Sequence, residues 1–141
     1  MSNTTFTMIK PDAIEANNHG SIIEKILASG FKISAMKMVL LSNYQAKKFY
    51  KIHEGKPFFE ELIDFITRGP VIVAVLNKKN AVEDFRNLIG TTDPSKAENG
   101  TIRKLFAKSV GENAIHGSDS NDNAKIESSF HFSTNEIFNE I

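Results

Sequence analysis

The segment Gly69-Pro70-Val71-Ile72-Val73-Ala74-Val75-Leu76 contains the longest apolar run of the chain and decides its fold class. The residues from Val71 to Leu76 are mostly β-branched and none is charged, which is typical of a strand in the centre of a sheet. Gly69-Pro70 ends the helix expected before it, because proline cannot continue a helix. The run is far shorter than the roughly 20 apolar residues of a membrane helix, so we expect no membrane-spanning segment.

Segments with strand or helix patterns lie on both sides of this central strand. Residues 4–9 are predicted to form a strand that Pro11 ends, residues 31–41 a strand buried unevenly on its two faces, and residues 130–132 a short edge strand with His131 outward. The predicted helices are one around residues 22–27 with a left-handed cap at Gly30, one from Ser42 to Tyr50, one from Pro57 to Arg68, one over 82–89 capped by Asn80, one over 102–106, and a small one to Ile141. Residues 90–100 and 111–123 are predicted to be loops.

This order of elements predicts the architecture. Strand, helix, strand, helix pair, strand, helix, strand can fold as two β-α-β halves around one sheet. We therefore predict one domain over residues 1–141 of class α+β: a ferredoxin-like sandwich with a four-stranded, mainly antiparallel sheet covered by helices.

Composition narrows the function classes. The chain has 141 residues with 40% hydrophobic content, enough for one continuous core. Its 17 Lys and Arg residues balance 17 Asp and Glu residues, so no overall field draws it to a membrane or to nucleic acid, and we expect no specific nucleic-acid partner. The absence of cysteine excludes disulfides and thiolate chemistry. With no signal-peptide pattern at the N-terminus, we expect a cytoplasmic protein.

The loop Ile115-His116-Gly117-Ser118-Asp119-Ser120 places a histidine among small polar residues. A neutral imidazole is a competent nucleophile towards phosphorus and a good leaving group once phosphorylated. Glu127, on a predicted helical turn, can accept a hydrogen bond from one ring nitrogen and so present the other for attack. Ser118 can bond to Glu127 or to a substrate oxygen. A solvated loop histidine, a surface glutamate and a turn-forming serine remain as alternatives.

Three cations are candidates for binding phosphate: Lys10 at a strand end, Arg86 on the polar side of a helix, and Arg103 on a short helix. Phosphate oxygens select guanidinium forks and lysine point charges. Thr92 and Asn113 lie in loops, where a hydroxyl and an amide can bond to phosphate or sugar. Each cation, taken alone, can equally be solvated or part of a surface ion pair.

The helix before the central strand carries two apolar stripes. Phe59, Ile63 and Ile66 form one, and Phe58 and Leu62 form another, offset by about 100°. One stripe is expected to face the core. The other stripe can be a platform on which a base of any kind stacks. Alternatively, both stripes can belong to the core or to a subunit interface, and the pattern alone favours this second interpretation.

Known phosphate-binding signatures are absent. No Gly-x-x-x-x-Gly-Lys-Ser/Thr loop exists, since Gly55-Lys56 is followed by Pro57 where the magnesium-binding hydroxyl should stand. The His-Arg-Asp and Asp-Phe-Gly signatures of protein kinases are also missing. If the chain handles nucleotide phosphates, it uses another scheme.

The His116 loop, preceded by Asn113, resembles the active-site signature of nucleoside diphosphate kinases, and the match is highly specific. Further blocks that resemble this family occur in its order over nearly the whole chain: Ile9-Lys10-Pro11-Asp12-Ala13, Gly30-Phe31-Lys32-Ile33, Phe49-Tyr50, Gly55-Lys56-Pro57-Phe58-Phe59, Gly69-Pro70-Val71, Asn80-Ala81-Val82 and Gly100-Thr101-Ile102-Arg103.

The resemblance implies a site and a mechanism. By it, His116 is phosphorylated by a nucleoside triphosphate and passes the phosphate to a nucleoside diphosphate, with Glu127 and Ser118 orienting the ring. The remaining implied site residues are Lys10, Tyr50, Arg86, Thr92, Arg103 and Asn113 for phosphate and sugar, and Phe58, Leu62 and Val110 for the rest of the nucleotide. The family uses Mg2+ that arrives largely with the phosphates, and it forms tetramers or hexamers built from a common dimer.

Some segments depart from the family pattern. Lys104-Leu105-Phe106 stands where the family often has Gly-Asp-Phe, and Asn99 where it often has proline. Residues 15–19 also differ, and the C-terminus is short. The alternative of another class is a ferredoxin-like ligand-sensing module without catalysis, but that reading leaves the intact His116 loop unexplained.

Overall fold

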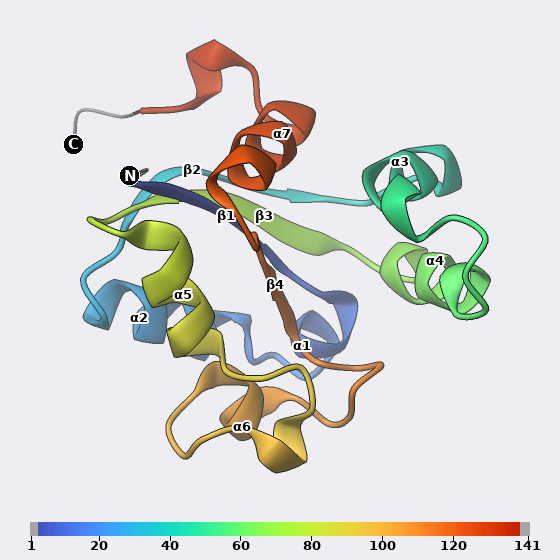
Figure 1. Ribbon diagram of the computed structural model, residues 1–141, viewed down its shortest axis with the longest axis horizontal. Helices are drawn as coiled ribbons and strands as arrows, with labels where there is room; N and C mark the ends of the chain where they lie inside the picture. The colour runs from blue at the N-terminus through green and yellow to red at the C-terminus, as the bar shows by residue number, and fades with distance from the viewer. Residues whose placement is uncertain (1–2, 139–141) are drawn as a thin grey trace.

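The computed structural model describes residues 3–138. They fold into one four-stranded antiparallel sheet, with strand order β2-β3-β1-β4, and the helices packed around it (Figure 1). The strands are β1 (Thr4–Ile9), β2 (Lys32–Val39), β3 (Val71–Asn77) and β4 (Ile115–Gly117). With β1 and β3 in the centre and β2 and β4 at the edges, this is the predicted ferredoxin-like α+β arrangement, which is confirmed.

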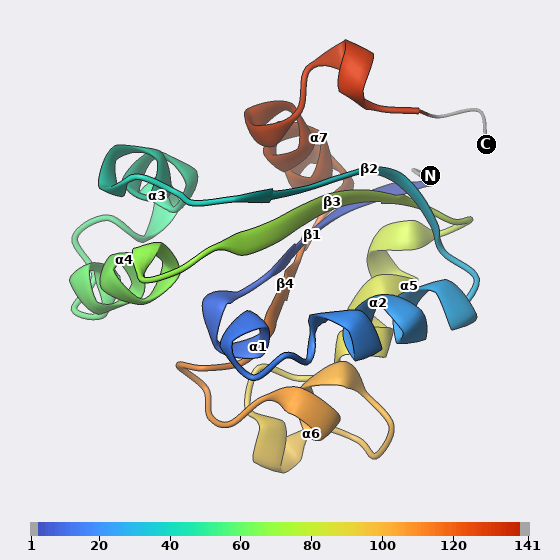
Figure 2. The ribbon, with the colours of Figure 1, turned by 180° about the vertical axis from the view of Figure 1, so that it is seen from behind.

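The helices cover both faces of the sheet. They are α1 (Pro11–Glu15), α2 (His19–Ala28), α3 (Asn43–Phe49), α4 (Phe59–Thr67), α5 (Ala81–Ile89), α6 (Ile102–Phe106) and α7 (Asn121–His131), with short 3-10 turns at Lys51–His53, Pro94–Lys96 and Thr134–Glu136. Figures 1 and 2 show α1, α2 and α5 on one face, α7 on the other, and the α3–α4 pair beyond one end of the sheet. Within residues 3–138, no helix is long and apolar enough to span a membrane.

The position of β3 in the centre of the sheet explains why all its residues from Val71 to Leu76 are apolar. Side chains alternate across a strand, and here both faces are covered. Ile72, Ala74 and Leu76 pack in the core shared with α2 and α5, whereas Val71, Val73 and Val75 pack in the core shared with α3 and α4. A strand buried on both faces must be apolar at every position, so the prediction of a central strand is confirmed.

The edge strand β2 is buried unevenly, as predicted. Ser34 and Ala35 are buried, whereas Met36 and Met38 are about half exposed. A register shift between Ile33 and Ala35 interrupts its pairing with β3, which is common at sheet edges.

Local signals placed most helix boundaries correctly. Ser42 caps α3 in a capping box with Gln45, and Gly30 has the left-handed φ of 94° expected after α2. Two predictions need correction. Helix α4 begins at Phe59 rather than at Pro57, and Asn80 precedes α5 in a left-handed conformation without a side-chain cap bond.

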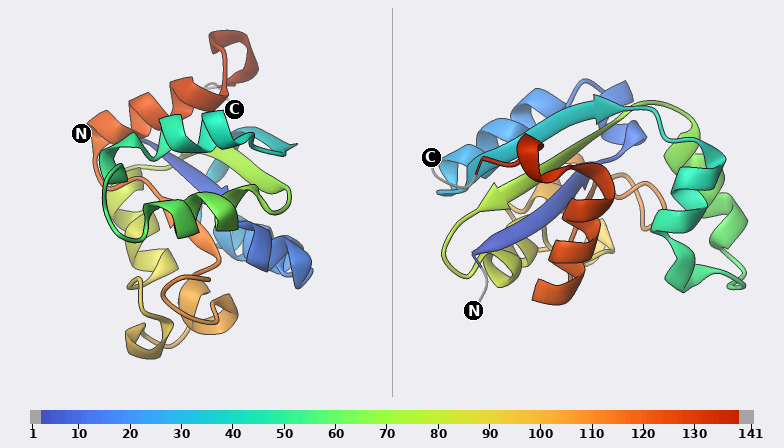
Figure 3. Two further views of the ribbon diagram at one scale, coloured as in Figure 1. Left: turned by 90° about the vertical axis from the view of Figure 1, so that its right-hand side faces the viewer. Right: turned by 90° about the horizontal axis from the view of Figure 1, so that it is seen from above.

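The C-terminal third differs most from prediction. Residues 111–123 are not one loop, because Ile115–Gly117 pairs with β1 as the fourth strand and α7 begins at Asn121. Residues 130–132 are not a strand, because α7 continues to His131 and lies across β1 (Figure 3). The predicted final helix is reduced to a 3-10 turn at Thr134–Glu136, and its last residues, 139–141, lie outside the described part.

Candidate active site

His116 is the middle residue of β4, and the strand fixes the direction of its side chain. It lies opposite Met8 in the pairing with β1, and the Thr7 hydroxyl donates a 2.8 Å hydrogen bond to its carbonyl oxygen. Because side chains alternate across a strand, its neighbours Ile115 and Gly117 pack towards α5. The imidazole therefore projects to the opposite face, where α7 lies.

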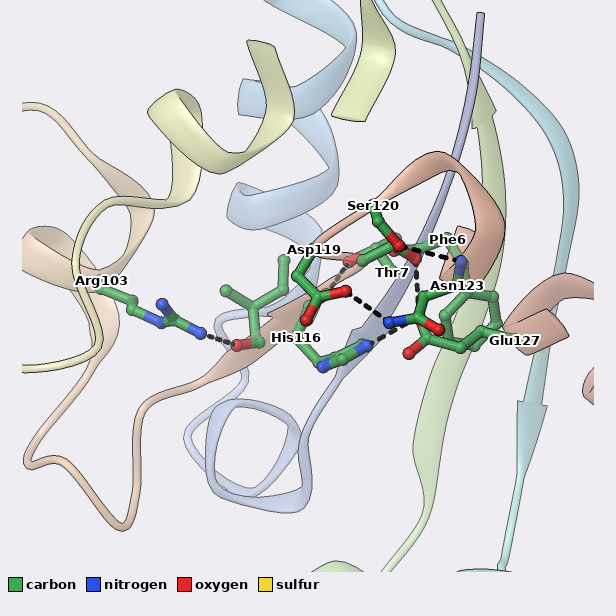
Figure 4. Close-up of polar contacts among 10 residues, drawn as sticks. Phe6, Thr7, Arg103, His116, Asp119, Ser120, Asn123 and Glu127 are labelled. Atoms are coloured by element: carbon green, nitrogen blue, oxygen red, sulfur yellow. Dashed lines mark hydrogen bonds and ion pairs between the residues drawn. The ribbon is translucent and has the colours of Figure 1, made fainter. Parts of the chain in front are cut away.

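Glu127 of α7 holds the imidazole through Nε2. The distance from His116 Nε2 to Glu127 Oε1 is 3.0 Å (Figure 4). The buried Ser118 hydroxyl donates to the same oxygen at 2.5 Å. A carboxylate can only accept, so the proton of the neutral ring resides on Nε2. Nδ1 then keeps its lone pair and is the nitrogen available to react.

The turn between β4 and α7 brings Glu127 into reach. The Ser120 side chain accepts from the Asn123 N–H at 3.1 Å and so caps α7. Asn123 Nδ2 in turn donates to Asp119 Oδ1 at 2.6 Å (Figure 4). With the helix start fixed in this way, Glu127 is carried back over β4.

Two aromatic rings flank the imidazole. The centroid of Phe6 on β1 is 6.2 Å from that of His116, and the centroid of Phe49 on α3 is 5.9 Å away, nearly edge-on at 76°. The His116 side chain keeps 21% of its surface exposed. The ring is thus held between apolar walls while a ligand can still reach it.

The residue before β4 has a strained backbone that is bonded at both ends. Ala114 has φ of 72°, a conformation that costs free energy for a residue with a Cβ. Its N–H donates to Asp12 Oδ2 at 3.1 Å, and its carbonyl accepts from the Lys10 N–H at 2.8 Å. Burial raises the pKa of Asp12 above its ordinary value. The start of α1 therefore holds the chain reversal that leads to His116.

Lys10 and Asn113 form a buried pair at this reversal. Lys10 Nζ donates to Asn113 Oδ1 at 2.8 Å, and both side chains are largely buried. Burial, aided by the charge of Arg103 and opposed by Asp12, lowers the pKa of Lys10 to about 8. Burial disfavours the charged form of this lysine, and a negatively charged ligand nearby would stabilise it.

Arg103 is the second buried cation of the site. Its Nη1 donates to Gly90 O at 3.0 Å and its Nη2 to Ile115 O at 2.8 Å. Burial and the nearby charge of Arg86 lower the pKa of Arg103 to about 10. Figure 4 shows Arg103 and Glu127 on opposite sides of His116, with Glu127 bonded to its ring and Arg103 bonded to the backbone just before it.

A pocket of about 230 Å³ brings together three of the predicted phosphate-binding residues. Arg86, Thr92 and Arg103 line it, with Ile89, Gly90 and Thr91 completing the wall. Among residues 3–138, neither arginine forms an ion pair with a carboxylate. Two unneutralised guanidinium groups and a hydroxyl are suited to the oxygens of a phosphate chain.

The predicted base platform is divided between the core and the surface. Phe59, Ile63 and Ile66 are buried, so this stripe of α4 is core. Phe58 is 46% exposed, with its ring centroid 5.4 Å from that of His53.

The other nucleotide-site candidates differ in exposure. Leu62 is half-buried against the core, whereas Val110 is exposed in the loop before Asn113. Tyr50 is buried, its hydroxyl finds no partner among the described residues, and burial followed by the charge of Glu127 raises its pKa. The roles of these residues in nucleotide binding stay predictions.

Several residues that build the site were not singled out from the sequence. Thr7 and Phe6 belong to β1, and their part depends on the pairing of β1 with β4, which no local pattern showed. Asp12 and Phe49 lie in blocks that resemble the family, but their contacts with Ala114 and His116 are tertiary. For Asp12 and Phe49, their place in a segment that resembles the family was the only sign in the sequence that they could belong to the site.

The donor set does not resemble a metal site. Within residues 3–138, no group of three or more His, Asp or Glu side chains could hold a metal ion. Of the described residues, two arginines and no carboxylate line the pocket beside Arg103. Hard metal ions such as Mg2+ prefer oxygen ligands, above all carboxylates. A metal at this site would be one that is bound to an anionic ligand.

Comparison with known sequences identifies the family. Residues 3–137 match the family model for nucleoside diphosphate kinase. The nucleoside diphosphate kinase of Flavobacterium psychrophilum is 53% identical over 137 residues, which cover 97% of this chain and 99% of that protein. That of Chloroherpeton thalassium is 52% identical over 132 residues, which cover 94% of each.

Comparison with solved structures gives the same result. The nucleoside diphosphate kinase of Aquifex aeolicus superposes with a TM-score of 0.93 at 40% identity, covering 96% of this chain and 98% of that one. The halophilic enzyme of Halobacterium salinarum, solved in complex with CDP, superposes with a TM-score of 0.92 at 35% identity, covering 97% of this chain and 91% of that one.

Proposed function

Since this chain belongs to the nucleoside diphosphate kinase family and is therefore a phosphotransferase, we propose that the phosphate it transfers is carried by His116. A nucleoside triphosphate donates its γ-phosphate and a nucleoside diphosphate accepts it. The observation that carries the proposal is the bond from His116 Nε2 to Glu127, because it leaves Nδ1 with a free lone pair.

The chemistry consists of two in-line displacements. Nδ1 attacks the γ-phosphorus, the bond from that phosphorus to the β–γ bridging oxygen breaks, and the nucleoside diphosphate leaves with the electron pair. A terminal phosphate oxygen of a second diphosphate then attacks the phosphohistidine, and Nδ1 recovers its lone pair. The sequence runs equally in reverse, because the bonds made and broken are alike.

Glu127 and Ser118 are positioning residues for this step. Attack through Nδ1 places positive charge on the ring, and the carboxylate bonded to Nε2 stabilises that charge. The Ser118 hydroxyl fixes the carboxylate oxygen that accepts from the ring. Phe6 and Phe49 prevent the ring from rotating away from the incoming phosphorus.

The cations provide the phosphate site. We assign Arg86, Arg103 and Thr92 to the phosphate chain and Lys10 with Asn113 to phosphate and sugar oxygens. The lowered pKa values of Lys10 and Arg103 favour this assignment, since an anionic ligand relieves the electrostatic cost of burying these charges together. Such a site neutralises equatorial charge as it develops in transfer.

Base recognition is proposed to be unspecific. The exposed face of Phe58 can stack on any base, and Leu62 and Val110 supply further apolar contact. The binding of CDP named for the Halobacterium salinarum structure supports a nucleoside diphosphate as a ligand of this fold. Tyr50, buried beside His53, is proposed to orient groups around the phosphates.

The cofactor and the assembly are further parts of the proposal. Membership in this family fits a requirement for a divalent metal, and we propose Mg2+ carried by the nucleotide phosphates, where it supplies charge neutralisation. We also propose one domain acting in the cytoplasm, where free nucleotides are dissolved, as a homo-oligomer of four or six subunits built from dimers. The exposed apolar edge of β2, with Met36 and Met38, suits a subunit contact.

The test is to label the protein itself. Wild type is incubated with Mg2+ and a γ-labelled triphosphate and then chased with a different diphosphate. We expect an acid-labile, base-stable label that moves to the second nucleotide and is absent in His116→Gln. His19→Gln, which removes a histidine of α2, serves as the control and should label normally. Normal labelling of the His116 variant would refute the assignment.

A further inference from the structure

Arg68, the residue that follows α4, is the centre of an ion-pair network that joins three segments of the chain. Its Nε and Nη2 donate to Glu15 Oε2 and Oε1 at 3.0 and 2.7 Å, a bidentate pair. Its Nη2 also donates to Glu112 Oε1 at 3.2 Å. Glu15 ends α1 and Glu112 lies in the loop before β4, so one guanidinium connects α4, α1 and that loop.

Glu112 is the residue that closes this loop. Its carbonyl oxygen accepts from the N–H groups of Lys108 and Ser109 at 3.0 and 3.3 Å, and its own N–H donates to Ser109 Oγ at 3.0 Å. The next residue, Asn113, accepts from Lys10 Nζ. A displacement of Glu112 therefore moves the Asn113 amide away from its partner.

The other end of the network leads to the same pair. Glu15 belongs to α1, the five-residue helix that starts directly after Lys10. Arg68 thus forms ion pairs both with the segment that carries Lys10 and with the segment that carries Asn113. The two segments are far apart in sequence, and the remaining bonds between them involve Ala114 with Asp12 and with the Lys10 backbone.

The geometry makes this network stronger than a typical surface pair. Isolated exposed ion pairs contribute little, because solvent screens them and side-chain entropy opposes them. A bidentate guanidinium shared between two carboxylates is the exception, since the fork is pre-organised and both acids benefit. The bond from Arg68 also lowers the pKa of Glu15 below its ordinary value, so this carboxyl stays ionised at a lower pH than a free glutamate does.

We propose that Arg68 is a positioning residue for nucleotide binding, because it holds the 108–113 loop against α1 and so fixes the Lys10–Asn113 pair and the loop that carries Val110. The proposal rests on the proposed function, which assigns these residues to the nucleotide site. Arg68 bonds to Glu15 and Glu112 rather than to the ligand. A bound nucleotide itself bonds to Lys10 and Asn113 and draws them back into place, so the loss of Arg68 weakens nucleotide affinity and leaves the transfer step nearly unchanged.

The experiment measures binding and turnover separately. The dissociation constant for ADP is determined by calorimetry for wild type, Arg68→Ala and Arg68→Gln, and kcat for phosphotransfer is determined in parallel. We expect ADP to bind about three to five times more weakly in both variants, with kcat within about twofold of wild type. Raising the salt concentration should weaken binding more in wild type than in the variants, because it screens the same network.

The matched control is Lys37→Ala. Lys37 also forms an exposed ion pair, with Glu136 at 3.4 Å, but on β2 and the C-terminal turn, and its loss should leave ADP binding unchanged. A double-mutant cycle with Glu112→Gln tests the route. If Arg68 acts through Glu112, the double variant binds ADP about as weakly as Arg68→Ala alone, and less weakly than the product of the two single effects.

Three results would overturn the proposal: unchanged ADP affinity in both Arg68 variants, the same loss in Lys37→Ala, or fully multiplicative effects of the Arg68 and Glu112 changes. Direct ADP binding does not require a phosphorylated histidine. A wild type that binds ADP but carries no label would therefore refute the His116 mechanism and leave the result for Arg68 intact.

Discussion

Replacing His131 by phenylalanine should remove an acid-sensitive part of the stability of this protein. His131 is the last residue of α7, and its ring stacks on Phe6 with 5.3 Å between centroids and 6° between planes. Its Nε2 is buried and has no hydrogen-bond partner among the described residues. Phenylalanine keeps the stacked ring and removes the unpaired polar atom.

The magnitude follows from the pKa of this ring. Burial, aided by the charges of Lys37 and His116 and opposed by Glu127, lowers the pKa of His131 from 6.5 to about 4. The folded protein therefore binds fewer protons than the unfolded chain between these values. The contribution of neutral His131 to the free energy of unfolding is fully present above pH 6.5 and is lost as the pH falls towards 4. The limit is roughly 3 kcal/mol, and solvent screening at the partly exposed ring reduces it to about 2 kcal/mol.

The assay is urea unfolding of wild type and His131→Phe at equal protein concentration between pH 7 and pH 4. At pH 7 the variant should be more stable by about 1 kcal/mol, because no buried nitrogen is left unpaired. At pH 4 the difference in the free energy of unfolding between the variant and wild type should be about 2 kcal/mol larger than at pH 7. Ser129→Ala, an exposed change on α7 without a titrating group, should give a constant difference. An advantage of His131→Phe that does not change with pH would refute the reasoning.

Three further changes test other parts of the structure. Gly117→Ala should destabilise by about 1 to 3 kcal/mol in urea unfolding, because its Cβ would lie 2.9 Å from Phe85, whereas Gly20→Ala, with no atom within 4 Å, should not destabilise. Since the pKa of Lys10 is lowered to about 8, its charge is present below that pH, so kcat/KM should fall as the pH rises through 8, and an unchanged rate up to pH 9 would contradict its role. Phe58→Ala should raise KM by about tenfold for purine and pyrimidine nucleotides alike, with an unchanged unfolding midpoint; a loss for only one base class would contradict unspecific stacking.

The sequence was informative wherever a local rule sets the structure. The run from Val71 to Leu76 had to be a central strand, because only a strand covered on both faces is apolar at every position. Ser42 and Gly30 marked helix ends, since a cap and a positive φ are local requirements. The signature around His116 identified the family, and the residues it named as phosphate ligands include the three that line one pocket.

Local rules failed in the C-terminal third. Phe130 and Phe132 on either side of His131 have the period of a strand, yet α7 continues through His131, because its capped start and its packing on β1 decide the conformation. Strand β4 has only the residues Ile115–Gly117, too few for any periodicity. Its pairing with β1 became visible only in the fold.

The sequence by itself therefore determined the fold class, three of the four strands, the family and the proposed nucleophile, because hydrophobic periodicity, helix caps and a specific motif depend on residues that are neighbours in the chain. Only the tertiary structure decided which ring nitrogen is free, since Glu127 reaches Nε2 through the packing of α7 on the sheet. It also decided that Lys10 meets Asn113 and that Arg68 joins Glu15 to Glu112. These contacts join residues far apart in the chain, and their geometry depends on how complete elements pack, which no local pattern encodes.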